Sequence, residues 1–186
     1  MPGRPDKDEH YDSTRPSNSE DHWFSWLKRQ LILKDIHAVS VEPPFPFRPR
    51  YAEWKKEFER FDVTPDTILV GHSCGGGFLV RYLSEHPDVH VGKVALVAPW
   101  INPDNNELSD TADFFDFTID ANFPSRTNGV SVFISSDDFP SVVTTVDILK
   151  ASTAGLVLHE FTDKGHFCIE NLGTTEFPEL LETVLE

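Results

Sequence analysis

The stretch Thr67-Ile68-Leu69-Val70-Gly71-His72-Ser73-Cys74-Gly75 places a G-x-S-x-G motif directly after a short apolar run. In a nucleophile elbow, a serine occupies a sharp turn between a buried strand and a helix, which exposes its hydroxyl group. Glycines flank it because larger side chains would collide with the neighbouring strand and helix. The apolar residues from 78 to 83 continue as an amphipathic helix, which should end before Pro87. The stretch therefore predicts a strand, an elbow at Ser73 and a helix.

Strand-like and helix-like segments alternate along the rest of the chain, and no internal repeats occur. This alternation is typical of a parallel sheet covered by helices on both faces. We predict a three-layer α/β sandwich over residues 21–186, with a mostly parallel central sheet. Residues 1–20 are polar and rich in proline, and we expect them to be disordered or loosely attached. The predicted helices are 23–34, 51–61 and 176–185, and the further predicted strands are 36–41, 93–98, 130–134 and 156–161.

A nucleophilic serine needs a histidine base and an acid that orients the histidine, in the chain order serine, acid, histidine for this motif. Asp137 and Asp138 follow the predicted strand 130–134, and His166 follows the strand 156–161. The carboxyl ends of parallel strands are where such side chains meet. Adjacent aspartates in a loop are also common in turns and helix caps, and only one of the two should face the histidine. The sequence predicts a triad of Ser73, one of these aspartates and His166.

Four other residues, Cys74, His72, His86 and His90, carry reactive or metal-binding side chains, but we expect none of these side chains to take part in the chemical step. Cys74 follows the nucleophile, and we expect its backbone N–H to contribute to the oxyanion hole while its thiol takes no part. His72 adjoins the serine in sequence and should be structural or should face the substrate. His86 and His90 resemble a metal-binding pair, but Pro87 between them prevents helical spacing, so we expect no metal and no cofactor.

The composition narrows the class of protein and of partner. The 186 residues include 31 acidic and 16 basic side chains, which give a formal net charge of −15. A chain this acidic is expected to bind neither nucleic acid nor an anionic membrane surface. Two cysteines do not form a disulfide framework, and neither a membrane-spanning run nor a signal peptide is evident. We expect a cytoplasmic protein.

Four segments together resemble one known family. The chain is similar to the small serine hydrolases of the α/β-hydrolase class typified by retinoblastoma-binding protein nine and the bacterial YdeN-type proteins. The similarity extends from about residue 20 to the C-terminus and implies Ser73 as nucleophile, His166 as base and Asp138, the second aspartate, as its orienting acid. The segments that carry it are His22-Trp23-Phe24-Ser25-Trp26-Leu27-Lys28, Gly71-His72-Ser73-Cys74-Gly75-Gly76, Ser135-Ser136-Asp137-Asp138 and Phe161-Thr162-Asp163-Lys164-Gly165-His166-Phe167.

The start of the chain departs from that family. The family begins with an apolar central strand that leads into a His-Gly or Pro-Gly loop, and this loop supplies the second oxyanion donor. Residues 1–9 contain no strand-like run, and His10-Tyr11-Asp12 is a candidate remnant of the loop. We therefore expect the usual first strand to be missing, through an altered or truncated N-terminus.

The sequence predicts a carboxylesterase-like serine hydrolase. We expect it to cleave a small ester, thioester or amide through an acyl-enzyme on Ser73. The alternative is a hydrolase-fold protein with weak or no catalysis that acts as a protein-binding module. Residues 102–128 are polar and aromatic and form either a lid or ordinary packed helix and loop. The proline-rich loop 43–49 either borders the active site or binds a partner protein.

Overall fold

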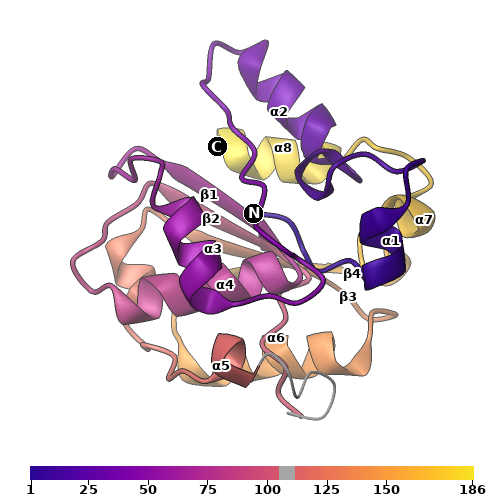
Figure 1. The fold of residues 1–186 in the computed structure, drawn as a ribbon. Helices are drawn as coiled ribbons and strands as arrows, with labels where there is room; N and C mark the ends of the chain where they lie inside the picture. The colour runs from indigo at the N-terminus through magenta and orange to yellow at the C-terminus, as the bar shows by residue number, and fades with distance from the viewer. Residues whose placement is uncertain (105–111) are drawn as a thin grey trace.

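One parallel sheet organises the computed structural model, which describes residues 1–104 and 112–186 (Figure 1). The described strands lie in the order β1-β2-β3-β4, and each is parallel to its neighbour. Parallel neighbours require crossover connections, and helices between the strands provide them. The predicted α/β class and parallel sheet are confirmed. The strands are β1 (Ile68–His72), β2 (Lys93–Val97), β3 (Val130–Ser135) and β4 (Leu156–Phe161).

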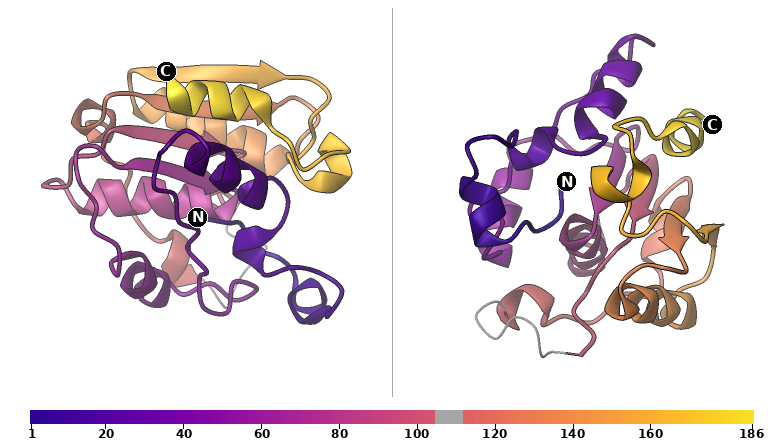
Figure 2. Two further views of the ribbon diagram at one scale, coloured as in Figure 1. Left: turned by 90° about the horizontal axis from the view of Figure 1, so that it is seen from above. Right: turned by 90° about the vertical axis from the view of Figure 1, so that its right-hand side faces the viewer.

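Helices cover both faces of this sheet. In Figure 1, α2 and α8 lie on one face, and α3, α4 and α6 lie on the other; Figure 2 shows the same layers from two further directions. No helix among the described residues is long and apolar enough to cross a membrane. The helices are α1 (Lys7–Tyr11), α2 (Phe24–Ile32), α3 (Tyr51–Phe58), α4 (Cys74–Glu85), α5 (Ala112–Phe115), α6 (Pro140–Ser152), α7 (Ile169–Leu172) and α8 (Pro178–Leu185), with 3₁₀ turns at Asn18–Glu20 and Phe123–Arg126.

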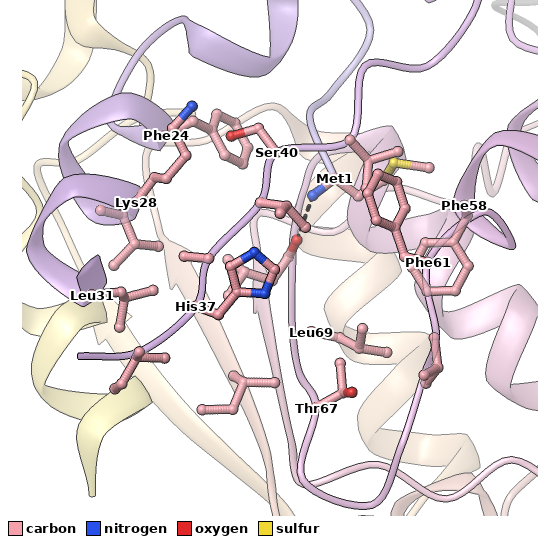
Figure 3. A pocket seen from close by; sticks show the side chains of 18 of the residues that line it. Met1, Phe24, Lys28, Leu31, His37, Ser40, Phe58, Phe61, Thr67 and Leu69 are labelled. Atoms are coloured by element: carbon pink, nitrogen blue, oxygen red, sulfur yellow. Dashed lines mark hydrogen bonds between the residues drawn. The ribbon is translucent and has the colours of Figure 1, made fainter. Parts of the chain in front are cut away.

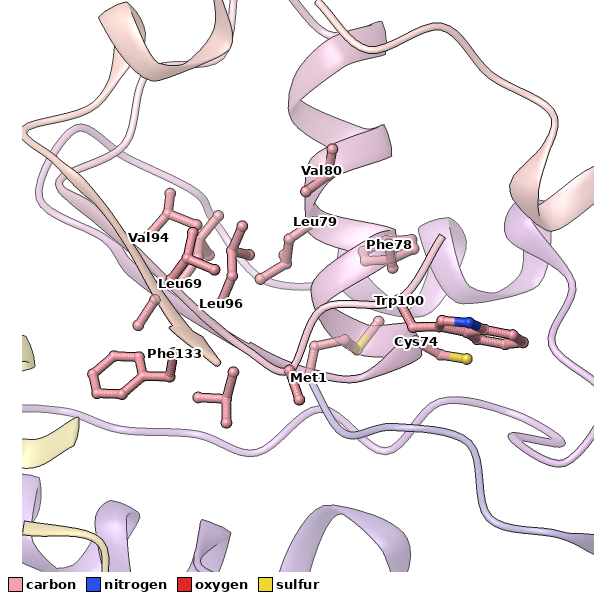
Figure 4. Close-up of a cluster of buried hydrophobic side chains, with 14 of the residues drawn as sticks. Met1, Leu69, Cys74, Phe78, Leu79, Val80, Val94, Leu96, Trp100 and Phe133 are labelled. Atoms are coloured by element: carbon pink, nitrogen blue, oxygen red, sulfur yellow. The ribbon is translucent and has the colours of Figure 1, made fainter. Parts of the chain in front are cut away.

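One part of the core lies between the sheet and α4, where apolar side chains from β1 and β2 meet the buried face of the helix (Figure 4). Buried apolar side chains of α2 and α8 form the part on the other face of the sheet. Aromatic rings extend the α4 part outward, because Phe114 of α5 packs edge-on against Trp54 of α3 and near Phe78 of α4. The described part of segment 102–128 thus contributes buried aromatic packing. Residues 105–111, which belong to the possible lid, lie outside the described residues.

The predicted strand 36–41 is wrong, because these residues form no β-ladder. A strand is stable only when a neighbour accepts and donates its backbone hydrogen bonds. The nearest candidate is β1, yet a cavity separates β1 from this segment, and both line it. Extended residues without a paired neighbour therefore replace the expected strand.

The first residues of the chain lie against β1, although we expected residues 1–20 to be disordered or loosely attached. The Met1 amino group donates to the Val70 carbonyl oxygen at 2.7 Å, and the His72 N–H donates to the Met1 carbonyl oxygen at 3.0 Å. Residues 1–3 are buried, and Asn18 binds the Gly3 carbonyl oxygen through its side chain. Only one residue pairs with β1 in this way, so the sheet has no full strand beyond β1 among the described residues. The boundary at residue 20 stays a prediction.

Candidate active site

Ser73 occupies the turn between β1 and α4 that the sequence predicted. Its backbone has φ 53° and ψ −122°, a conformation that non-glycine residues rarely adopt. A Cβ atom built on Gly71 would lie 2.7 Å from the Gly75 carbonyl oxygen, so no side chain fits there. This close approach explains the glycine at position 71, and Ser73 is the residue that directly precedes α4.

The start of the chain passes directly beside this elbow. A Cβ atom on Gly75 would lie 2.2 Å from the Met1 carbonyl oxygen, and one on Gly3 would lie 2.9 Å from Ser73 Cβ. The absence of side chains at Gly3 and Gly75 thus allows the backbone of Met1 and Pro2 to approach the elbow closely.

The candidate loop remnant at residues 10–12 lies elsewhere, which corrects our hypothesis. His10 and Tyr11 end helix α1 and pack their rings against Phe47. The Pro2-Gly3 dipeptide lies beside Ser73 instead. The family resemblance could have identified this dipeptide, because a Pro-Gly loop is one of the two forms that the family has after its first strand.

The structure brings His166 and Asp138 together. His166 Nδ1 lies 2.8 Å from Asp138 Oδ1, and the Asp138 side chain is fully buried. Asp138 Oδ1 also accepts a hydrogen bond from the Phe139 N–H at 2.6 Å. Asp137 points to a different set of partners, because its Oδ1 accepts from the Ser135 hydroxyl and from the Gly165 N–H. Asp138 is therefore placed to orient the imidazole, while Asp137 ties the histidine loop to β3.

Ser73 and His166 line one cavity of about 540 Å³, which we call the active-site cavity. Its wall also includes the aromatic rings of Trp100 and Phe139. Among the described residues no hydrogen bond joins Ser73 Oγ to His166. Such bonds are often long in enzymes without substrate and tighten when the substrate binds.

Cys74 is the first residue of α4, and its side chain is buried. A helix leaves its first N–H groups without an intrahelical acceptor, and its dipole favours negative charge at that end. Burial raises the pKa of the Cys74 thiol to about 12, so the thiol stays protonated near neutral pH. The position suits the backbone N–H for an oxyanion, whereas the thiol is a poor nucleophile.

The His72 side chain contacts the backbone of the loop that carries His166. The sequence had left open whether His72 is structural or faces the substrate. The ring is buried and its Nε2 lies 2.8 Å from the His166 carbonyl oxygen, so Nε2 carries the proton that it donates. Burial, followed by the nearby His166 and His22 rings, lowers the pKa of His72 well below its usual value of 6.5. A neutral His72 is therefore part of the folded state.

This burial predicts acid sensitivity that depends on His72. Between the lowered folded-state pKa and the unfolded value of 6.5, the unfolded chain binds more protons, so the free energy of unfolding should fall as the pH falls below about 6.5. Urea unfolding at pH 7.5 and 5.5 would measure this loss. The variant His72→Gln keeps a polar side chain but does not titrate, and its loss should be smaller. An equal loss in both proteins would contradict the assignment.

One further cluster could hold a metal ion. Ligand atoms of His22, Cys168 and Glu170 lie within 4.8 Å of one another at the edge of the active-site cavity. Two of them have partners already, since Ile169 N–H donates to His22 Nδ1 at 3.3 Å and Arg15 pairs with Glu170 at 2.8 Å. The other candidate pair, His86 and His90, binds neighbouring backbone carbonyl oxygens.

Comparison with known proteins agrees with this architecture. The chain matches the serine hydrolase family over residues 15–185. The serine hydrolase RBBP9 of Rattus norvegicus is 27% identical over 169 residues, which cover 87% of this chain and 84% of that protein. YdeN of Bacillus subtilis is 33% identical over 86 residues, a local match that covers 44% of this chain and 45% of YdeN.

The similarity also extends to the fold. The crystal structure of the ydeN gene product from B. subtilis superposes with a TM-score of 0.74 at 24% identity and covers 92% of each chain. An esterase from Exiguobacterium antarcticum superposes with a TM-score of 0.59 at 15% identity, over 89% of this chain and 88% of that one. Since the family match spans most of the sequence, the chain belongs to the serine hydrolase family and is an enzyme of the hydrolase class.

Proposed function

We propose that the protein cleaves a small ester, thioester or amide through an acyl-enzyme formed on Ser73. The observation that carries the proposal is the buried Asp138–His166 pair, which shares one cavity with a serine held on a strained elbow. A nucleophile, a base and an acid that orients the base are the three parts of this chemistry.

The reaction proceeds in two halves. His166 Nε2 removes the hydroxyl proton as Ser73 Oγ attacks the substrate carbonyl carbon, and the imidazolium that forms is stabilised by the Asp138 carboxylate. The tetrahedral intermediate collapses when His166 gives its proton to the leaving group. Water then attacks the acyl-enzyme with the same histidine as base, which releases the acid and restores Ser73.

The oxyanion would lie between two backbone segments. Cys74 N–H is one donor, at the start of α4. The segment Gly3-Arg4 lines the cavity beside Ser73 and is our candidate for the second donor. A missing donor typically costs on the order of 10² to 10³ in rate, so the position of this segment matters for activity.

The walls of the active-site cavity suit a short acyl or aryl group. Trp100 and Phe139 supply apolar surface. Arg4 and Arg15 also line the cavity, and Arg15 forms ion pairs with acidic side chains of the same lining, among them Glu170 at 2.8 Å. A small neutral or weakly charged acyl compound fits this mixture better than a polymer.

A weakly active or inactive protein-binding hydrolase fold is the alternative. Two observations favour it, both limited to residues 1–104 and 112–186: no hydrogen bond joins Ser73 to His166, and no full strand lies beyond β1. A reactive serine separates the two possibilities.

The experiment is to mix the purified protein with p-nitrophenyl acetate and to record both the release of nitrophenol and the intact mass after rapid quenching. An acyl-enzyme predicts an initial burst and a mass increase of one acetyl group, located on the peptide that contains Ser73. Slow release with no acetylated peptide would favour the binding module.

A further inference from the structure

Three residues with metal-binding side chains gather at the edge of the active-site cavity, although they come from distant parts of the chain. His22 lies just before α2, and Cys168 and Glu170 follow His166. One ligand atom of each lies within 4.8 Å of the other two. Zinc ligands in a tetrahedral site lie about 3.5 Å apart, so side-chain shifts of about 1 Å would bring these atoms around one Zn²⁺ ion.

This grouping of donors is specific to one place in the structure. Within residues 1–104 and 112–186, it is the one set of three such side chains whose ligand atoms lie this close together. A cavity of about 590 Å³ beside β1 offers a contrast (Figure 3). His37 is the one histidine among the described residues of its lining, which include no cysteine. The metal-binding side chains therefore gather beside the candidate catalytic residues.

The imidazole ring of His22 presents an unprotonated nitrogen to the other two residues. Its Nδ1 accepts a hydrogen bond from the Ile169 N–H at 3.3 Å, so this nitrogen holds a lone pair and faces the backbone between Cys168 and Glu170. Burial lowers the pKa of His22, which favours the neutral ring that binds metals. A metal ion at Nδ1 would replace this one long hydrogen bond.

Glu170 is able to turn toward a metal because its present partner has others. Arg15 pairs with Glu170 at 2.8 Å and also with Glu9 and Asp21, each at 3.5 Å. Arg15 would keep two acidic partners if the Glu170 carboxylate moved. One arginine facing three carboxylates leaves an excess of negative charge here, and this charge favours a bound dication.

The two segments that carry the ligands are already joined. Trp23 Nε1 donates to the Phe167 carbonyl oxygen at 3.1 Å, and both side chains are fully buried. Trp23 directly follows His22, and Phe167 directly precedes Cys168. Because the backbone is held on both sides of the cluster, a metal would have to order little of the chain, and this preorganisation favours affinity.

We propose that His22 Nδ1, Cys168 Sγ and a carboxylate oxygen of Glu170 bind a Zn²⁺ ion at the edge of the active-site cavity, with water as the fourth ligand. Imidazole, thiolate and carboxylate are the protein ligands of zinc. Burial, followed by the acidic side chains nearby, raises the pKa of the Cys168 thiol to about 12, so the metal-free protein keeps it protonated. As the zinc–sulfur bond forms, this proton passes to the solvent.

Zinc bound here should inhibit hydrolysis, a consequence that rests on the proposed function. Cys168 and Glu170 line the same cavity as His166. A dication at this edge makes a protonated His166 less favourable, and the reaction passes through that protonated form. We therefore expect the rate with p-nitrophenyl acetate to fall as the site fills and to recover when a chelator removes the metal.

Metal titration tests the site without an enzymatic assay. The reduced protein is titrated with Zn²⁺ by calorimetry and with Co²⁺ by absorbance. Both titrations contain excess Mg²⁺, which occupies general carboxylate sites and suits nitrogen and sulfur ligands poorly. We expect saturable binding of one Zn²⁺ per chain. We also expect a sulfur-to-cobalt charge-transfer band in the near ultraviolet, which reports a thiolate bound to the metal.

The two cysteines of the chain make a matched pair of variants. Cys168→Ser keeps a group that can donate to the His166 carbonyl oxygen, as the thiol does at 3.8 Å, but it removes the sulfur ligand. The cobalt band should vanish, and the affinity for Zn²⁺ should fall at least tenfold, on the order of the loss known for changes around metal sites. Cys74→Ser removes the other thiol and should alter neither readout.

The histidine and the carboxylate are tested in the same way. His22→Gln and Glu170→Gln keep polar side chains of similar size, and each should weaken Zn²⁺ binding by at least about tenfold. His86→Gln, which changes a histidine far from the cluster in sequence, should leave the binding unchanged. Circular dichroism spectra check that every variant is folded.

The outcomes for the metal site and for the hydrolase are separate. Absence of saturable Zn²⁺ binding in excess Mg²⁺, or binding that Cys168→Ser does not weaken, would overturn the proposed site. Zinc binding that leaves the rate of an active enzyme unchanged would overturn the inhibition. If the protein hydrolyses no ester, the proposed function fails, while the calorimetric and cobalt titrations still decide whether the metal site exists.

Discussion

Replacing Ser73 with alanine should abolish ester hydrolysis and covalent labelling by a fluorophosphonate probe. The change removes the only atom proposed to attack the carbonyl group, and loss of a catalytic serine lowers kcat by on the order of 10⁶. Initial rates with p-nitrophenyl acetate and gel fluorescence after labelling are the two measurements. The fold should survive, because alanine keeps the Cβ atom and the backbone hydrogen bond from Ser73 N–H to Val97 O.

Cys74→Ala is the matched control for this variant. It changes the adjacent residue and removes the other candidate nucleophile, yet it keeps the backbone N–H at the start of α4. Labelling should therefore persist in Cys74→Ala. Labelling that survives Ser73→Ala but not Cys74→Ala would assign the reaction to the thiol and contradict the proposed mechanism.

The parts of the site that the sequence predicted are those encoded by local pattern. The elbow needs a strand, two close glycines and a helix in one short stretch, and the structure has all of them around Ser73. The parallel sheet follows from the alternation of elements, because only crossover connections of that length join parallel strands.

Long-range contacts account for what the sequence missed. Residues 36–41 have the composition of a strand, but a strand depends on a neighbour, and no sequence pattern shows whether that neighbour exists. The approach of Gly3 to Ser73 and the support of His166 by His72 join segments far apart in the chain. Helix α6 was not predicted, because its apolar residues lack the clear periodicity of α2 or α8.

The choice between Asp137 and Asp138 came from resemblance, and the structure gives it a physical basis. Both carboxylates are acceptors near the histidine loop, but they hold different atoms. Asp138 contacts the imidazole ring itself, whereas Asp137 binds the backbone N–H of Gly165 and the Ser135 hydroxyl. Only the first contact changes strength as the ring gains a proton during the reaction, so only Asp138 should affect the chemical step strongly.

Asparagine at each of the two positions makes a matched pair of variants. Asp138→Asn keeps an oxygen near His166 Nδ1, but it removes the negative charge that stabilises the imidazolium. It also puts an amide NH₂ group in the place of Oδ2, which is buried and has no hydrogen-bond partner among the described residues. We expect kcat to fall by on the order of 10³ to 10⁴. Asp137→Asn keeps an acceptor for Gly165 and should lower kcat by less than about tenfold.

The comparison is made with kcat for p-nitrophenyl acetate, after thermal unfolding has shown that both variants are folded at the assay temperature. Because the two changes are chemically identical and one residue apart, a general loss of stability would affect both. A larger loss for Asp137→Asn would mean that the loop bearing His166, and not the charge beside its ring, limits the reaction. The roles assigned to the two aspartates would then be reversed.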